Sequence, residues 1–344
     1  KSLFLQVSLP LSREKLEKTM TLNRRKFLTA AAAAAPATLA LGGLSAQPAL
    51  ATSGAPTGIP GLYQFQIGQA KVTALLDGHL PLSADLFPGL DQGWAEKVLN
   101  DGLYGGLDNM SIPINSYLIE QAGSVVLVDT GAAQNMGPGL GAFHKALAAA
   151  GVSVDQVDTI LLSHLHLDHV GGLIDANGQA VFPNAEIVTN QAEWNFWHDD
   201  ANMAAAPDSM KSFFDIARNS VAPYANRVRM AEGEKDLGHG FTSVPMAGHT
   251  PGHTGYQLSS GDDTLLIWGD MILSTAFQFP NPNVSVVFDG DSQKAAATRR
   301  RILDRAAADR IWVAGMHLDF PALGRVRQDG TAFVYDAAPW QAAL

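Results

Sequence analysis

The sequence of 344 residues contains no cysteine, and only 16% of its residues are charged. The missing cysteines exclude disulfide bonds and thiolate metal sites, so any bound metal must take nitrogen and oxygen ligands. Because charged residues are few and 47% of the residues are apolar, extensive disorder is not expected. A chain of this length and composition can bury a substantial core.

Basic side chains are also in the minority. The formal net charge is −10, and residues 1–51 carry seven of the 23 basic and two of the 33 acidic side chains, which leaves −15 for the remainder. Such a surface repels phosphate backbones and anionic lipid headgroups. We therefore expect neither nucleic acid nor a membrane surface as a partner.

The segment 20–51 has the order of a secretory signal peptide. Arg24 and Arg25 precede Phe27 and Leu28, an alanine-rich apolar stretch follows, and a small-x-small site ends at Ala51. This pattern is typical of twin-arginine export and predicts a periplasmic location, with a retained N-terminal anchor as the alternative. Residues 1–19 precede Met20 and are interpreted as an upstream extension, residues 52–62 as a flexible leader, and residues 63–344 as one domain.

Short apolar runs separated by turn residues dominate the remainder. Alternating runs meet at Gly68 and at Gly123, which predicts two early hairpins, and a last hairpin is expected within "GRVRQDGTAFVYD". Helical spacing predicts helices over residues 139–151, from Gln191, around "DSMKSFFDIARNSVAPY" and over "DSQKAAATRRRILDRAAAD". Two strand-rich halves, each closed by helices, predict an α/β fold of two packed sheets with helices outside.

Potential metal ligands stand at the ends of four buried strands. The first strand runs into "SHLHLDHVGG", and three later strands each end in one ligand type, which together give His164, His166, Asp168, His169, His249, Asp270 and His317. Strand ends of a rigid scaffold are where a site is assembled. Seven nitrogen and oxygen ligands exceed one tetrahedral ion and fit two ions that share a carboxylate and activate water, which predicts hydrolysis.

The set HxHxDH, His, Asp and His, preceded by "VDTG", resembles the metallo-β-lactamase superfamily, whose fold is an αββα sandwich. The resemblance implies that His164, His166 and His249 hold one ion, Asp168, His169 and His317 the other, and that Asp270 bridges them. It also implies that Asp129 orients a ligand and that Asp168 and Asp270 are the catalytic carboxylates, Asp168 as a late proton acceptor. Zinc is the expected metal, with Mn, Co or Fe possible by ligand type.

The remaining histidines are not expected to bind metal. His253 lies four residues beyond His249 and is interpreted as a structural histidine behind the ligands. No pattern supports a role for His79, His144, His198 or His239.

Further residues bear on the substrate. Stretches such as "FPNAEIV", "GHTPGHTGY" and "HLDFPALGRVR" resemble methyl parathion hydrolases, in which aromatic side chains clasp the aryl group of an organophosphate triester. That resemblance implies a homodimer and a pocket with Trp197 and Phe213, but with Met136 in place of an aromatic residue. The alternative is a lactonase or aryl esterase, including acyl-homoserine lactones, although Leu273 stands where those lactonases usually carry tyrosine. A non-catalytic metal-binding protein is the least favoured alternative.

Overall fold

The computed structural model describes residues 60–102, 106–107, 110–133, 136–137 and 139–340. The predicted extension 1–19, the predicted signal peptide 20–51 and most of the leader lie outside these residues. The leader was predicted to reach residue 62, but strand β1 already begins at Leu62. Within the described residues, no helix combines the length and hydropathy required to cross a membrane.

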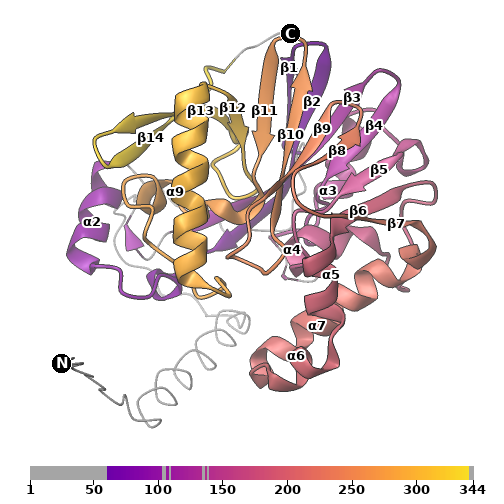
Figure 1. Ribbon diagram of the computed structural model, residues 1–344, viewed down its shortest axis with the longest axis horizontal. Helices are drawn as coiled ribbons and strands as arrows, with labels where there is room; N and C mark the ends of the chain where they lie inside the picture. Colours follow the sequence, from indigo (N-terminus) through magenta and orange to yellow (C-terminus); the bar gives the residue numbers. More distant parts are fainter. Residues whose placement is uncertain (1–59, 103–105, 108–109, 134–135, 138, 341–344) are drawn as a thin grey trace, which may run out of the picture. The chain divides into compact units, whose positions relative to one another are not determined.

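The described residues form two seven-stranded mixed sheets (Figure 1). The first sheet has the order β1 to β7, with the strands β1(Leu62–Ile67), β2(Ala70–Pro81), β3(Ser111–Gln121), β4(Ser124–Val128), β5(Thr159–Leu161), β6(Glu186–Asn190) and β7(Val228–Ala231). The second has the reverse order, with β8(Lys235–Gly238), β9(Phe241–Pro245), β10(Thr254–Ser260), β11(Asp263–Ile267), β12(Trp312–Ala314), β13(Leu323–Asp329) and β14(Ala332–Ala337). The three predicted hairpins are β1–β2, β3–β4 and β13–β14.

Helices cover the outer faces of the sheets. They are α2(Gln92–Asp101), α3(Phe143–Ala149), α4(Leu167–Val170), α5(Gln191–His198), α6(Asp200–Ala205), α7(Asp208–Val221), α8(Thr275–Gln278) and α9(Ser292–Asp309). Figure 1 shows α9 alongside β12 and β13, and α5 to α7 beside β6 and β7. Two mixed sheets flanked by helices make the αββα architecture, and the predicted fold class is confirmed.

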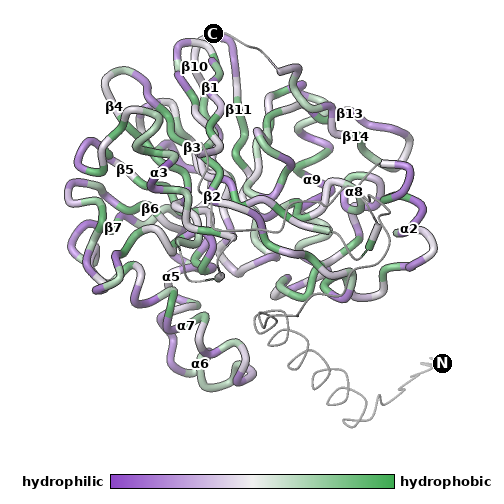
Figure 2. The backbone as a smooth tube through the Cα atoms, turned by 180° about the vertical axis from the view of Figure 1, so that it is seen from behind, coloured by the Kyte–Doolittle hydropathy of each residue, from purple (hydrophilic) through white to green (hydrophobic). Residues whose placement is uncertain are grey.

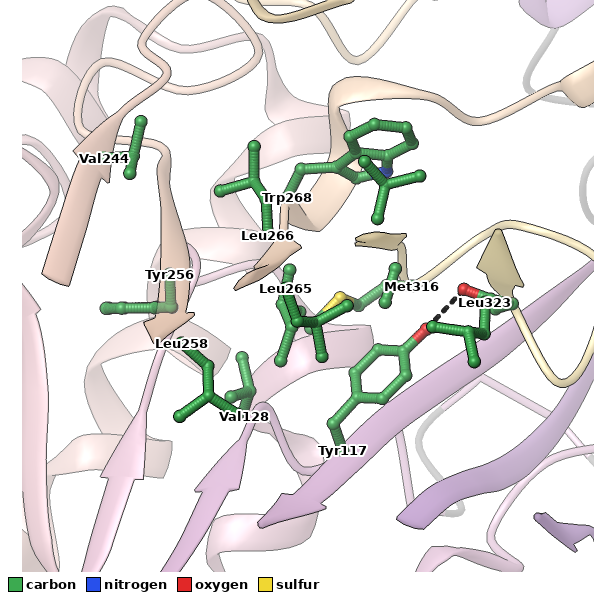
Figure 3. Packing of buried hydrophobic residues seen from close by; sticks show 14 of the residues in the cluster. Tyr117, Val128, Val244, Tyr256, Leu258, Leu265, Leu266, Trp268, Met316 and Leu323 are labelled. Atoms are coloured by element: carbon green, nitrogen blue, oxygen red, sulfur yellow. Dashed lines mark hydrogen bonds between the residues drawn. The ribbon is translucent and has the colours of Figure 1, made fainter. Parts of the chain in front are cut away.

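The main core lies between the two sheets. Tyr117 and Ile119 of β3 face this layer, while the intervening Leu118 packs on the opposite side with the helices, as the two-residue period of a strand requires. Figure 3 shows Tyr117 pointing from the first sheet toward Leu265 and Met316 of the second half of the chain. Figure 2 shows hydrophobic strands at the centre and hydrophilic turns at the rim.

Helix α3 is shorter than its sequence pattern predicts. A helix was predicted from residue 139, but α3 begins at Phe143. The buried carboxylate of Asp77, on β2, accepts hydrogen bonds from the backbone of Ala132, Gly141 and Phe143 at 3.0, 3.1 and 2.8 Å. A carboxylate that accepts the first N–H groups of a helix marks its start, and this one comes from a strand remote in sequence.

The sequence patterns also left elements unassigned. Helices α2 and α6 and strands β7 and β8 were not predicted. β7 pairs in parallel with β6, and β8 pairs with β9, so both are defined by their neighbours.

Candidate metal centre

Strand ends of both sheets meet at one edge of the sandwich. In the first sheet β4, β5 and β6 are parallel, and in the second β11 and β12 are parallel, so their carboxyl ends share an edge within each sheet. Hydrogen bonds join the sheets there, from the Tyr256 hydroxyl to the Leu162 carbonyl (2.6 Å) and from the Asn115 N–H to the Met316 carbonyl (2.8 Å). The two sheets therefore present their strand ends to a common volume.

The seven predicted ligands all lie in that volume. Their donor atoms form two sets, each within 4.8 Å, which we call the first donor set (His164, His166, His249 and Asp270) and the second donor set (Asp168, His169, Asp270 and His317). Asp270 belongs to both sets. The structure thus groups the residues as the superfamily resemblance implied, with the same shared carboxylate.

The first donor set has the spacing that a small tetrahedral ion needs. Nδ1 of His166 lies 3.0 Å from Nε2 of His164 and 3.2 Å from Nε2 of His249. The Asp270 carboxylate lies 3.6 and 3.3 Å from the same two Nε2 atoms. Ligands about 2.0–2.1 Å from a tetrahedral zinc ion are about 3.3 Å apart, so these donors fit the ion.

The second donor set is equally compact. Nε2 of His169 lies 3.1 Å from Asp270 and 3.4 Å from Asp168, and Nε2 of His317 lies 3.0 and 3.6 Å from the same two carboxylates. Nε2 of His169 and Oδ1 of Asp270 are buried and have no hydrogen-bond partner among the described residues. These two atoms lie 3.1 Å apart without forming a hydrogen bond, and a cation held by the donor set would satisfy both.

Burial and mutual charge shift the acidity of these groups in the metal-free protein. Burial and the neighbouring His249 lower the pKa of His166 to about 3. Burial opposes the charged form of His249, yet hydrogen bonds with Asp270 and Asp289 raise its pKa to about 9. Burial likewise disfavours charged Asp168, but neighbouring His169 lowers the pKa of that carboxyl to about 2. The carboxylates are therefore ionised at neutral pH, and a cation would displace protons from histidine.

Residues behind the ligands fix their orientation. Asp129 accepts hydrogen bonds from the backbone and hydroxyl of Ser163 (2.8 and 2.6 Å) and lies 2.7 Å from Nδ1 of His169. Carboxylates in this position hold a ligating imidazole in one orientation. Asp129 therefore contacts the Nδ1 side of the His169 ring, while the Nε2 atom of the same ring faces the second donor set.

His253 is absent from both donor sets. Its Nδ1 lies 3.1 Å from the Met246 carbonyl, and its Nε2 accepts the backbone N–H of Asp270 at 3.0 Å. Gly269, just before that aspartate, has a φ of +58°, and a Cβ there would lie 2.4 Å from the His253 ring. His253 therefore supports the backbone of the shared carboxylate and leaves no room for a side chain at Gly269.

Three buried charged residues of the site were missed in the sequence. Glu193 of α5 accepts three hydrogen bonds from the ligand loops and a fourth from Trp197 of its own helix. Asp289 lies 3.0 Å from Nδ1 of His249, and Arg299 of α9 lies 3.6 Å from the other Asp289 oxygen. Nothing local marks Asp289, which precedes Gly290 and Asp291, or Arg299, which is the first of three consecutive arginines. Glu193 has the position of an ordinary acidic residue in the first turn of a helix.

The predicted pocket residues are spread over different surroundings. Leu273 lines a cavity of about 120 Å³ beside His317, together with Leu82, Leu99, Met110, Ser111, Ile112, Ser274, Thr275, Ala276 and Asp319. Phe213 and Trp197 place their rings 5.9 and 5.5 Å from the His166 ring. Trp197 is buried among the helices, and Met136 packs on a small cluster around Leu140. Among the four, Leu273 alone lines this cavity.

A fold of two packed sheets with clustered nitrogen and oxygen donors at their common edge defines a metal-binding hydrolase scaffold. The family model of the metallo-beta-lactamase superfamily matches residues 112–313. The chain belongs to this superfamily, and it is a metal-dependent hydrolase.

Individual relatives share both sequence and fold. The hydrolase AbOPH of the beta lactamase superfamily is 32% identical, with a TM-score of 0.79 over 83% of this chain and 100% of that one. AidC, a dizinc quorum-quenching lactonase solved with a product homoserine, is 26% identical, with a TM-score of 0.77 over 82% and 99% of the two chains. An N-acyl homoserine lactonase from a Bacillus species is 26% identical over 62% of this chain and 82% of its own length.

One further match is short. It is 37% identical over 68 residues to the anti-Pycsar protein Apyc1 of Paenibacillus harenae, and it covers 20% of this chain and 24% of that protein. The dizinc relative and the donor chemistry support divalent metal, with zinc favoured, in this chain as well. The closer resemblance to methyl parathion hydrolases stays a prediction.

Proposed function

We propose that this protein hydrolyses lactones, with N-acyl homoserine lactones as the leading substrate class, and that it does so with two divalent ions per chain. The observation that carries the proposal is the pair of donor sets joined by Asp270, in a chain that resembles a dizinc lactonase over 82% of its length. This is the alternative that the sequence left beside organophosphate hydrolysis.

Two divalent ions in the donor sets would supply Lewis-acid activation of water and of the substrate carbonyl. The chain's own residues supply positioning and proton transfer. Asp129 and His253 fix His169 and the Asp270 backbone from behind. Asp168 is the least enclosed ligand, with 13% of its side chain exposed, so it is the carboxylate placed to accept a proton from solvent-side chemistry.

The cavity beside His317 suits the apolar part of such a substrate. Leu82, Leu99, Met110, Ile112 and Leu273 contribute apolar side chains to it. Ser111, Ser274, Thr275, His317 and Asp319 add polar groups to the same cavity, and a small-molecule site combines apolar walls with polar groups that fix orientation. We assign the acyl chain of the lactone to this cavity and the reacting carbonyl to the His317 end.

Organophosphate triesters are the second candidate. The observation in their favour is the pair of aromatic rings, Phe213 and Trp197, that face the His166 imidazole. An aryl leaving group would pack against Phe213, the more exposed of the two.

The deciding experiment compares substrates on one zinc-loaded preparation. Purified protein is assayed for ring opening of N-hexanoyl-homoserine lactone, for hydrolysis of an aryl ester, and for p-nitrophenol release from methyl parathion. We expect the lactone to give the highest kcat/KM, and Asp270→Asn, which keeps the side-chain volume, to abolish turnover. Turnover of methyl parathion without turnover of the lactone would replace the lactonase proposal with the triester one. Two further predictions can be checked alongside. The oligomeric state of the purified protein tests the homodimer, and fractionation of the producing cells tests periplasmic export.

A further inference from the structure

The carboxylate of Glu193 is completely buried and accepts four hydrogen bonds. Oε1 accepts the backbone N–H of Leu165 at 3.0 Å and the indole N–H of Trp197 at 2.6 Å. Oε2 accepts the hydroxyl of Thr250 at 2.6 Å and the backbone N–H of Gly252 at 2.9 Å. A buried carboxylate is costly unless hydrogen bonds compensate it, and here both oxygens are fully engaged.

Each oxygen serves one ligand loop. Leu165 lies between His164 and His166, and Thr250 directly follows His249, so the two oxygens reach the two loops that carry the three histidines of the first donor set. These loops are far apart in sequence: His166 and His249 are separated by 83 positions, yet their ring nitrogens lie 3.2 Å apart. One side chain on α5 therefore ties together two loops that belong to different sheets.

The second donor set has other supports. Nδ1 of His169 is held by Asp129 at 2.7 Å, and Nδ1 of His317 lies 3.0 Å from the carbonyl of Pro113. Three of the four donors to Glu193 lie in the loops of the first donor set, and the fourth, Trp197, lies on α5 with its ring 5.5 Å from the His166 ring. Asp129 also reaches the first set at His164, because the Ser163 hydroxyl that donates to it lies 3.0 Å from Nδ1 of His164. Of the described ligand loops, Glu193 in contrast contacts only those of the first set.

We propose that Glu193 is a positioning residue for one of the two metal sites, and that its carboxylate holds His164, His166 and His249 at the spacing that binds the ion. The proposal rests on the ligand assignment made under Proposed function. An amide cannot replace the carboxylate, because its NH₂ group would face N–H donors at one of the two loops.

The test is the metal content of Glu193→Gln under chelator competition. Substitution of a residue that hydrogen-bonds behind the metal ligands typically weakens metal binding by roughly 10- to 100-fold. We expect wild type to retain two zinc ions per chain at a chelator concentration where Glu193→Gln retains one, measured by elemental analysis after desalting. In a His317→Ala background, which already weakens the second donor set, the same substitution should leave less than one ion.

The matched control is Asp77→Asn. Asp77 is also a buried carboxylate that accepts three backbone N–H groups, but these belong to residues 132, 141 and 143. We expect Asp77→Asn, like Glu193→Gln, to lower the melting temperature, but without selective loss of one zinc ion. If Glu193→Gln does not fold, Thr250→Val removes a single donor and should still weaken one ion.

Retention of both ions by folded Glu193→Gln, or loss of both in parallel, would overturn the proposal. So would equal metal loss in Asp77→Asn. A wild-type protein that binds two ions but hydrolyses no lactone would refute the proposed function alone, and the positioning role would still be tested by the metal counts.

Discussion

Substitution of Asp289 by alanine should be among the most destabilising single changes in this protein. The Asp289 side chain is fully buried, and its two oxygens lie 3.0 Å from Nδ1 of His249 and 3.6 Å from the guanidinium of Arg299. Arg299 also donates to the carbonyls of Met271, Pro282 and Val284, at 2.7, 2.8 and 3.1 Å. Without Asp289 those hydrogen bonds survive, but the buried positive charge loses its counter-ion.

The magnitude follows from that unpaired charge. Removal of one partner from a buried ion pair costs about 3–5 kcal/mol. For a domain of this size, each kcal/mol lowers the melting temperature by about 2–4 °C, so the expected fall is about 6–20 °C. The double variant Asp289→Ala/Arg299→Met should lose less stability than the sum of the two single variants, because each single variant leaves one buried charge without its partner and the double variant leaves neither.

The assay is urea unfolding of metal-free protein, which removes the contribution of the ion. A loss below about 1 kcal/mol for Asp289→Ala, or losses that simply add up in the double variant, would refute the reasoning. In the metal-loaded protein the same substitution should also weaken the ion held by His249, since that imidazole loses the acceptor behind it.

Three further outcomes are expected. Removal of metal by chelator should lower the melting temperature measured by calorimetry, and added zinc should restore it. If free zinc was present at 1,000 times its dissociation constant, the loss corresponds to about 4 kcal/mol of unfolding free energy. Gly248→Ala should reduce both stability and zinc retention, because Gly248 has a φ of +142° and a Cβ there would lie 2.3 Å from the Ala295 nitrogen; unchanged zinc retention would contradict this. Tyr256→Phe should lower the free energy of unfolding in urea by roughly 1–3 kcal/mol, because the buried Leu162 carbonyl, which accepts the hydroxyl at 2.6 Å, would lose its donor. An unfolding free energy unchanged within error would show that the sheets do not depend on this bond.

The sequence was informative wherever local pattern determines structure. Hairpins turning at Gly68 and Gly123 and apolar runs ending in His249, Asp270 or His317 are local features, and all of them correspond to elements of the fold. Ligands at strand ends could be grouped because parallel neighbours bring their carboxyl ends together.

The features that sequence did not predict depend on contacts between distant segments. Glu193, Asp289 and Arg299 are charged residues that would ordinarily be assigned to the surface. The burial of each depends on polar partners from other segments of the chain, up to 59 positions away. Trp197 illustrates the reverse, since a tryptophan predicted to face substrate is 2% exposed and donates its indole N–H to Glu193.

The ligands are divided between the two sheets, so the amount of bound metal indicates whether the two sheets have docked correctly. His164, His166, Asp168 and His169 follow a strand of the first sheet, whereas His249, Asp270 and His317 follow strands of the second. Neither sheet alone offers a complete donor set, so an ion can be held tightly only after the two have docked in register. A preparation with native helix and strand content that fails to take up added zinc is therefore expected to contain chains whose two sheets are formed but not docked in register.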